Sequence, residues 1–268
     1  MMESLPPKTP DPLTSDRSVM LVHAPSPALA AGQRTHVAHQ PIDFELAQSQ
    51  HAAYCQALAG CGLNVRLLDV NRDAPDGVFL EDTAIILDEI AILCSMGTAA
   101  RRREPLAIEP ILREVREVRR IDLPATIEGG DVLRIGRNLL VGVSSRTNAA
   151  GVAALCSLVE PLGYQLTAVP VLGCLHLKTA CTALPDGRLL VNPSWIETAA
   201  LRNYECLDIP AAEPWAANTL PVGQRVILPA AHRQTAALIQ RLGFEPLPVD
   251  LSEFAKAEGG VTCLTLRC

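Results

Sequence analysis

The sequence of 268 residues lacks the features that mark membrane, secreted and nucleic-acid-binding proteins. No apolar run approaches the roughly 20 residues that a membrane-spanning helix needs. There is no run rich in Lys and Arg, and the net charge is -6, so we expect neither nucleic acid nor a membrane as a partner. Residues 1–17 are Pro-rich and polar and have no apolar segment of the kind found in secretory signals. We expect them to form a loose, disordered tail.

Motifs for metals, phosphates and disulfides are missing as well. His36 and His39 lie three residues apart but have no partner Cys pair. The glycine pairs at 129–130 and 259–260 lack the spacing of phosphate-binding loops. The nine cysteines are scattered without any C-x-x-C, which favours a reducing cytoplasm over a disulfide framework. We therefore expect no metal, no organic cofactor and a cytoplasmic location.

What the sequence does contain is a repeat. Polar residues open successive predicted strand pairs at regular separations of 47, 48, 42 and 45 residues: Glu81, Glu128, His176, Asn218 and Cys263. Amphipathic helices are predicted between the pairs, at residues 106–118, 146–162, within 195–204 and at 235–242, after a first helix at 44–59. A period in the forties with two strands and a helix per unit is typical of repeat architectures.

Closing five such units into a ring would bring the start of every strand pair to one centre and would remove exposed sheet edges. The predicted strand at 19–22 would complete the last pair together with the C-terminal residues. The alternative is an ordinary α/β fold in which each strand carries some polar residue. We favour the ring, as one α/β domain over residues 18–268.

The segment 258–263, Glu-Gly-Gly-Val-Thr-Cys, is a candidate for the reactive part of the chain. Its glycine pair allows a positive φ or a close approach to another group. Residues 261–266 are predicted to form a short buried strand with Cys263 near its start. A thiol after a flexible turn can enter a cavity, although most buried cysteines are only small apolar side chains.

Six segments, in this order along the chain, resemble the dimethylarginine dimethylaminohydrolases of the guanidine-modifying (pentein) superfamily. They are Pro-Asp-Gly-Val-Phe-Leu-Glu-Asp at 75–82, Ile-Glu-Gly-Gly-Asp at 127–131, Ser-Arg-Thr-Asn at 145–148, Leu-His-Leu-Lys-Thr at 175–179, Ala-Ala-Asn at 216–218 and Gly-Gly-Val-Thr-Cys at 259–263. The resemblance extends from about residue 19 to the C-terminus. It implies a five-bladed, pseudo-symmetric α/β propeller of ββαβ units with a central active site.

The resemblance also implies an activity, the hydrolysis of Nω,Nω-dimethyl-L-arginine or Nω-methyl-L-arginine to L-citrulline and dimethylamine or methylamine. The reaction would pass through a covalent thiouronium on Cys263, without metal or cofactor. His176 would be the general acid and base, and Glu128 would pair with a guanidinium nitrogen and orient the site. The implied substrate-binding residues are Asp76, Glu81 and Asp82 for the guanidinium and amine ends, Arg101 and Arg146 for the carboxylate, and the backbone of Ala257 near the α-amino group.

The chemistry agrees with these roles. A guanidinium is a planar cation whose donors suit carboxylates, and a carboxylate calls for Arg in return. Its carbon is a poor electrophile, so a thiolate is the appropriate nucleophile, and a bound cation favours ionising the thiol. Without the resemblance, His176 between two leucines is equally typical of a core histidine. Arg101 opens an Arg-Arg-Arg run, so a shift of one position would move its role to Arg102.

The choice of substrate depends on contacts from a lid. In the family, the loop after the first strand carries an apolar residue that closes over the substrate, but residues 30–34 offer no large apolar side chain near Gln33. Arginine or another N-substituted guanidine stays an alternative substrate. Arginine deiminases carry an inserted helical domain for which the chain has no room, and an agmatine deiminase would not use two arginines. An amidinotransferase and a non-catalytic guanidine-binding protein are further alternatives. We expect a small-molecule partner and leave a homodimer open.

Overall fold

The computed structural model describes residues 19–268. The tail expected at residues 1–17 lies outside this range. Within it, no helix is both long and apolar enough to cross a membrane.

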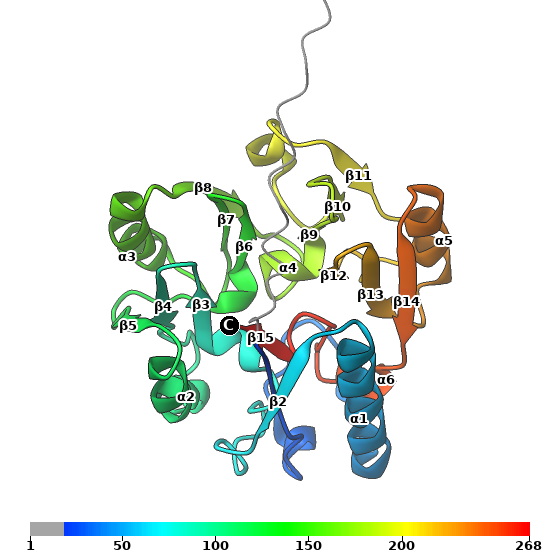
Figure 1. The fold of residues 1–268 in the computed structure, drawn as a ribbon, viewed down its shortest axis with the longest axis horizontal. Coiled ribbons are helices and arrows are strands. Elements are labelled where there is room, and N and C mark those ends of the chain that lie inside the picture. The colour runs from blue at the N-terminus through cyan, green and yellow to red at the C-terminus, as the bar shows by residue number, and fades with distance from the viewer. Residues whose placement is uncertain (1–18) are drawn as a thin grey trace, which may run out of the picture.

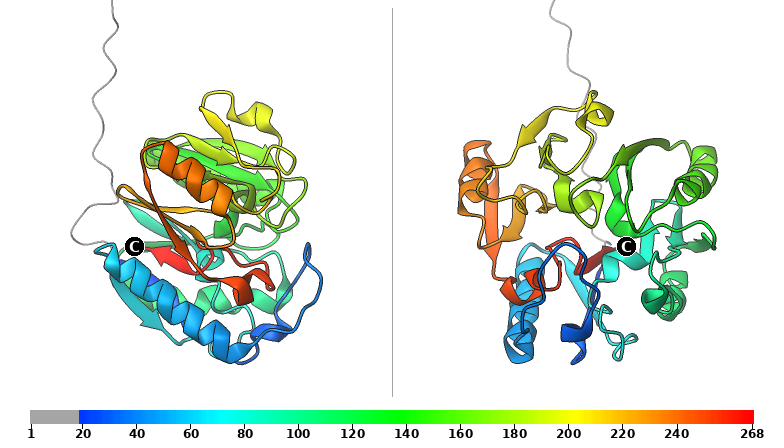
Figure 2. Two further views of the ribbon diagram at one scale, coloured as in Figure 1. Left: turned by 90° about the vertical axis from the view of Figure 1, so that its right-hand side faces the viewer. Right: turned by 180° about the vertical axis from the view of Figure 1, so that it is seen from behind.

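Five three-stranded sheets surround a common centre, with helices on the outside of the ring (Figure 1). In every sheet the middle strand pairs antiparallel with one neighbour and parallel with the other. The same five blades are seen from behind in Figure 2. The predicted five-bladed α/β propeller is therefore confirmed.

The blades follow the chain in order, except that the first includes the last strand. Blade one contains β15 (Thr265–Arg267), β1 (Val19–His23), α1 (Phe44–Gly60) and β2 (Asn64–Leu68). Blade two contains β3 (Ala84–Ile86), β4 (Ile90–Leu93), α2 (Glu104–Arg113) and β5 (Glu117–Arg120). Blade three contains β6 (Val132–Ile135), β7 (Asn138–Val143), α3 (Ala149–Val159) and β8 (Gln165–Pro170). Blade four contains β9 (Cys181–Ala183), β10 (Leu189–Val191), the 3-10 helix η7 (Thr198–Leu201) and β11 (Cys206–Asp208). Blade five contains β12 (Leu220–Val222), β13 (Arg225–Pro229), α5 (Arg233–Arg241) and β14 (Glu245–Val249).

Short helical turns connect the strands and helices, both within the blades and between them. They are η2 (Leu29–Ala31), η3 (Leu80–Thr83), η4 (Ala99–Arg101), η5 (Gly129–Asp131), η6 (Glu160–Leu162), α4 (Leu177–Ala180) and α6 (Ser252–Ala255). Three of them, η3, η5 and α4, directly precede the first strand of a blade. They matter for the site because they turn the chain at the centre of the ring.

Side-chain caps fix where two of the outer helices begin. The carboxylate of Asp43 accepts a hydrogen bond from Leu46 N at 3.0 Å, and Asn148 Oδ1 accepts one from Gly151 N at 2.8 Å. Such caps satisfy amide groups that have no partner within the first turn. The helix predicted at 146–162 therefore begins after Asn148, and Arg146 stays outside it.

Two further predicted elements differ from the structure. The helix predicted at 106–118 ends at Arg113, because the chain turns at residues 114–116 and continues as the parallel strand β5. The strand predicted at 261–266 begins only at Thr265, so Cys263 precedes the strand instead of lying in it. Residues 261–264 form a turn, in which Thr265 N donates to Thr262 O at 3.1 Å.

Candidate active site

The polar residues predicted to open the units do meet at the centre of the ring. Glu81 lies in η3, Glu128 immediately precedes η5, and His176 immediately precedes α4. Each of these turns reverses the chain just before a strand, so the side chain at the reversal points inward instead of following the alternation of the sheet. Asn218 and Cys263 occupy the corresponding places in the other two blades, without a helical turn.

His176 and Glu128 form a buried pair. Nε2 of His176 lies 2.8 Å from Oε2 of Glu128, and Nδ1 lies 3.7 Å from Oδ1 of Asp82. The other oxygen of Glu128 accepts a hydrogen bond from Gly97 N at 2.9 Å, which fixes the carboxylate. Burial by itself lowers the pKa of His176, but the Asp82 charge and the Glu128 hydrogen bond outweigh it and raise this pKa to about 9. The imidazole is thus held protonated, as a proton donor must be.

Arg101 is used almost entirely within the protein. Its Nη1 donates to Asp82 Oδ2 at 2.7 Å, its Nε and Nη2 donate to Glu104, and Nη2 also donates to Phe79 O at 3.1 Å. Burial opposes ionisation of Asp82, but His176 and Arg101 outweigh it and lower the pKa of that carboxyl. Arg101 is buried whereas Arg102 is exposed, so the structure turns the first arginine of the run toward the centre.

Arg146 has a hydrogen-bond donor that is not used within the protein. It is buried, and its Nη1 has no hydrogen-bond partner among the residues that the structure describes. The nearest anion is Oε1 of Glu128, 3.6 Å from that nitrogen. A buried guanidinium nitrogen without a partner is costly, and a ligand carboxylate would satisfy it.

Cys263 faces carboxylates as well as the imidazole. Its Sγ accepts a hydrogen bond from Gly260 N at 3.3 Å. Burial, followed by the charges of Glu81 and Asp82, raises the pKa of the thiol to about 12. Glu81 is itself engaged, by Lys178 Nζ at 2.5 Å and by Thr262 Oγ1 at 2.7 Å. In this state the thiol is neutral and needs an additional positive charge to ionise.

A small cavity of about 20 Å³ joins these side chains. Of the nine predicted site residues, seven line it: Asp76, Asp82, Arg101, Arg146, His176, Ala257 and Cys263. The other two, Glu81 and Glu128, lie behind this lining and hold it through Thr262 and His176. Gln33, the residue expected at the lid position, also lines the cavity, and its backbone N–H donates to the Asp76 carboxylate at 3.1 and 3.2 Å.

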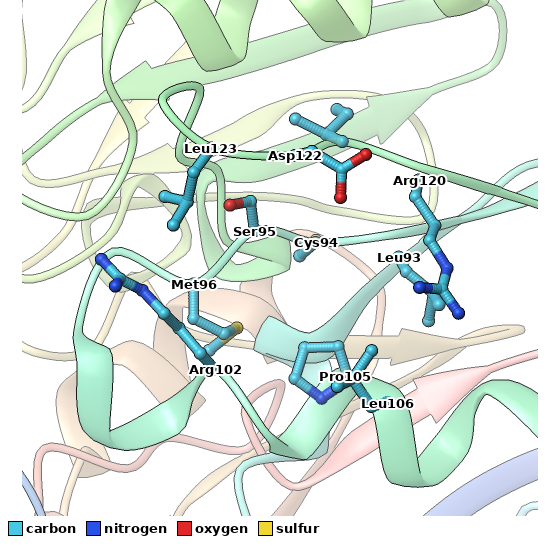
Figure 3. A pocket seen from close by; sticks show the side chains of 11 residues that line it. Leu93, Cys94, Ser95, Met96, Arg102, Pro105, Leu106, Arg120, Asp122 and Leu123 are labelled. Atoms are coloured by element: carbon cyan, nitrogen blue, oxygen red, sulfur yellow. The ribbon is translucent and has the colours of Figure 1, made fainter.

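A larger cavity of about 360 Å³ lies elsewhere, beside β4 and the start of α2 (Figure 3). None of the nine predicted residues lines it. Its cysteine, Cys94, has a pKa well above the usual range because of burial and the charges of Glu128 and Asp82. No histidine lines this cavity to serve as a base. The larger cavity therefore does not suit nucleophilic catalysis.

Some residues of the site were not assigned a role from the sequence. Lys178 pairs with Glu81, and Asn218 donates from Nδ2 to Lys178 O at 2.8 Å and to Thr262 Oγ1 at 3.0 Å. The regular spacing of the repeat had already pointed to Asn218. Lys178 lies two positions after His176, within the family-like segment 175–179. Glu258 and Phe79 also line the cavity; both lie in segments that the sequence singled out, but neither was assigned a role.

Asp82, Glu128 and His176 also bring one possible ligand atom each within 4.8 Å of one another, close enough to hold a metal ion. The charges of these three side chains are already compensated within the protein, however. Arg101 and Arg146 lie beside the two carboxylates, and the His176 nitrogen Nε2 is hydrogen-bonded to Glu128. The arrangement suits proton transfer at the thiol better than metal coordination.

Comparison with known proteins gives consistent results. A sequence model of the arginine deiminase family matches residues 69–207. An N(G),N(G)-dimethylarginine dimethylaminohydrolase of Streptomyces coelicolor is 41% identical over 248 residues, covering 92% of this chain and 95% of the relative. The enzyme of the same name from Pseudomonas aeruginosa is 34% identical over 250 residues, covering 92% and 98%.

Solved structures agree in fold. A cysteine-to-serine mutant of the P. aeruginosa enzyme in complex with citrulline has a TM-score of 0.87 and 32% identity, covering 93% of this chain and 98% of that one. A dimethylarginine dimethylaminohydrolase adduct with S-methyl-L-thiocitrulline has a TM-score of 0.89 and 33% identity, covering 93% and 99%. The N-terminal domain of a cyanobacterial arginine dihydrolase, at 21% identity and a TM-score of 0.82, shows a shared fold alone.

Proposed function

Because the chain belongs to the dimethylarginine dimethylaminohydrolases of the arginine deiminase family, we propose that it hydrolyses Nω,Nω-dimethyl-L-arginine and Nω-methyl-L-arginine. The products are L-citrulline and dimethylamine or methylamine. One observation carries the proposal: a single cavity holds the Cys263 thiol together with the His176 imidazole, which is hydrogen-bonded to Glu128. This combination supplies a nucleophile, an acid or base and the group that orients it.

The charges of the cavity match the substrate from end to end. The guanidinium is placed beside Cys263, where Asp82 and Glu128 supply negative charge. Arg146, with its unpartnered Nη1, binds the α-carboxylate, and Arg101 contributes to it from behind while it positions Asp82. Asp76 and the backbone of Ala257 lie toward the α-amino group, and Glu81 supports the wall beside the thiol.

The bound cation prepares the nucleophile. The thiol has a pKa of about 12 because burial and the charges of Glu81 and Asp82 oppose the thiolate, and a guanidinium bound beside the sulfur and Asp82 offsets this opposition. The thiol proton passes to solvent as the substrate binds, and the thiolate attacks the guanidinium carbon to give a neutral tetrahedral adduct. His176 protonates the departing dimethylamine nitrogen, the carbon–nitrogen bond breaks, and a thiouronium remains on Cys263.

The second half of the reaction reverses the role of the imidazole. After giving up its proton, His176 accepts one from a water molecule, which adds to the thiouronium carbon. Collapse of this adduct forms the carbonyl group of citrulline, breaks the carbon–sulfur bond and passes the hydroxyl proton to the departing sulfur, which restores the neutral thiol beside the protonated imidazole. Glu128 stabilises the imidazolium in both halves through its 2.8 Å hydrogen bond.

The experiment is an assay of citrulline (or carbamoylputrescine) formation from asymmetric dimethylarginine, monomethylarginine, arginine and agmatine. Wild type is compared with Cys263→Ser and with the control Cys268→Ser, a half-buried cysteine that does not line the cavity. We expect turnover of the methylated arginines, lost in Cys263→Ser and kept in Cys268→Ser. Turnover mainly of arginine would support the deiminase alternative, with Gln33 as the first residue to examine. No turnover by a folded protein would favour a guanidine-binding role.

Three further points are proposals of the same kind. We infer a cytoplasmic location, which the nine free cysteines support because a reducing compartment keeps thiols unpaired. Residues 18–268 are proposed to act as one catalytic domain. A homodimer is the third proposal, and light scattering of the purified protein measures the oligomeric state.

A further inference from the structure

Glu258 has an unusual backbone conformation beside the reactive cysteine. Its φ is 61°, and it is the single non-glycine residue with a positive φ within residues 19–268. A side chain with a Cβ is disfavoured there, and such conformations persist where the surroundings hold them and often serve a function. Glu258 follows Ala257 and precedes the glycine pair that leads to Cys263.

One oxygen of this carboxylate holds the loop after β1. Oε1 of Glu258 accepts hydrogen bonds from the consecutive backbone N–H groups of Thr35, His36 and Val37, those of Thr35 and Val37 at 2.8 Å. Gln33 N is held in turn by Asp76. Two carboxylates of the cavity wall thus tie down residues 33–37. With the loop held, the cavity is about 20 Å³, far smaller than the several hundred Å³ usual for ligand sites.

The other oxygen has no partner. Oε2 of Glu258 is buried and makes no hydrogen bond within the part of the chain that the structure describes. No salt bridge of Glu258 is found among the same residues. Removing an anionic oxygen from water without a donor is costly, and a cation with N–H donors is the ligand that offsets this cost best.

The position of Glu258 indicates which cation. Its side chain lines the same cavity as Cys263, but it reaches the loop 35–37, whose Thr35 and His36 are exposed, whereas His176 and Glu128 are buried. Glu258 is therefore at the outer end. An arginine derivative with its guanidinium at Cys263 presents its α-carbon groups there, and Arg146 already accounts for the carboxylate. The group left to recognise is the α-ammonium.

We propose that Glu258 is a specificity residue that selects substrates carrying an α-ammonium group, with Oε1 holding the loop 35–37 and Oε2 accepting a hydrogen bond from the substrate. The inference rests on the proposed function, which assigned only the Ala257 backbone and Asp76 to that end of the substrate.

The test compares Nω-methyl-L-arginine with its des-amino analogue, in wild type and in Glu258→Gln. Glutamine keeps one oxygen for the loop N–H groups but loses the negative charge. We expect kcat/KM for the amino acid to fall by about tenfold or more, the usual effect of losing a hydrogen bond to a charged group, with little change for the des-amino analogue. Equal losses on both substrates would overturn the proposal, since Glu258 would then act only through the loop. Exposed Glu45 on α1 provides the control Glu45→Gln, which should change neither value.

Two additional measurements separate a loss of α-ammonium recognition from a failure of the proposed function. Glu258→Gly relieves the positive φ and removes both oxygens, so a folded variant should lose the preference for the α-ammonium and weaken on both substrates. Retention of the wild-type preference in this variant would contradict the proposal. Failure of the wild type to hydrolyse either substrate would contradict the proposed function instead. In that case calorimetric binding of L-citrulline and des-amino citrulline to Cys263→Ser, with and without Glu258→Gln, measures the same selectivity without turnover.

Discussion

Two buried arginines of the site have different tasks, although their motifs implied the same one. Arg101 gives most of its donors to Asp82, Glu104 and Phe79, whereas Nη1 of Arg146 has no hydrogen-bond partner among the described residues. The first is therefore mainly a structural cation and the second a binding one. A motif can identify an arginine that faces a cavity, but the number of its free donors depends on residues far away in the sequence.

This difference predicts two kinds of defect. Arg146→Ala should raise KM for methylated arginine by about 10–100-fold through loss of a charge-assisted hydrogen bond, with a small change in stability.

Arg101→Ala should instead cost about 3–5 kcal/mol of folding free energy, because it leaves Asp82 and Glu104 buried without their cation. Steady-state kinetics and denaturant unfolding separate the two effects. Exposed Arg102→Ala is the control, and equal KM changes in all three variants would contradict this assignment.

The buried imidazole predicts a pH dependence of stability. The pKa of His176 is about 9 in the folded protein against an ordinary value of 6.5, so the proton is held more tightly in the native state. The stabilisation of the folded protein by this bound proton is complete below pH 6.5 and is lost as the pH rises through about 9. A shift of this size corresponds to about 3 kcal/mol. The unfolding free energy of wild type should fall by that order across this window, relative to His176→Asn. Parallel pH profiles for the two proteins would show that the shift is absent.

At the scale of elements, the glycine pair before Cys263 works through close approach and not through a positive φ. Neither Gly259 nor Gly260 has a positive φ, but a Cβ at Gly260 would collide with Oδ1 of Asn218. That oxygen accepts a hydrogen bond from Thr262 N, and the Asn218 amide also holds the backbone of Lys178. Gly260 thus allows two blades to meet at the thiol.

Gly260→Ala should therefore reduce activity strongly and destabilise the protein by about 1–3 kcal/mol, as overpacking in a core does. The matched control is Gly60→Ala, at the end of α1, where a Cβ would meet nothing within 4 Å. This control should be active and more stable by about 0.5–1 kcal/mol. Thermal melts and the citrulline assay measure both effects. An active Gly260→Ala protein would mean that the amide of Asn218 can shift without disturbing Cys263.

The arrangement of the ring was easier to predict from the sequence than the bounds of its helices and strands. The ring followed from regular spacing, because Glu81, Glu128, His176, Asn218 and Cys263 all stand at chain reversals at the centre. The elements themselves were less well predicted. The helix predicted at 106–118 was too long because the apolar periodicity continues past Arg113 into β5. The strand predicted at 261–266 began too early because Val261 and Leu264 are buried in a turn, and two buried apolar residues there give the same sequence pattern as a strand. Glu258 lies in the segment singled out around Cys263, but its role could not be predicted, since its partners are the backbone amides of a loop more than 200 residues away in the sequence.

At the scale of the molecule, the ring is closed by the two ends of the described chain. β1 pairs with β15, with Leu21 opposite Leu266, so that the strand after Cys263 is held by the first strand of the fold. Leu266 is 5% exposed and packs with Leu21 and Leu68 of blade one and with Leu93 of blade two. Closure of the sheet and positioning of the thiol are therefore one event, because only Leu264 separates Cys263 from β15.

Leu266→Ala should destabilise the whole ring and not blade one alone. The expected cost is about 2–5 kcal/mol for a large-to-small change in a packed core. Both tryptophans, Trp195 and Trp215, pack against each other at 4.7 Å in or next to blade four, so their fluorescence reports unfolding far from the substitution. If the ring unfolds cooperatively, the fluorescence and circular dichroism midpoints fall together. Leu67→Ala, on the same sheet but 61% exposed, should change stability by no more than about 0.5 kcal/mol. A fluorescence midpoint that stays at the wild-type value in Leu266→Ala would show that the blades unfold independently.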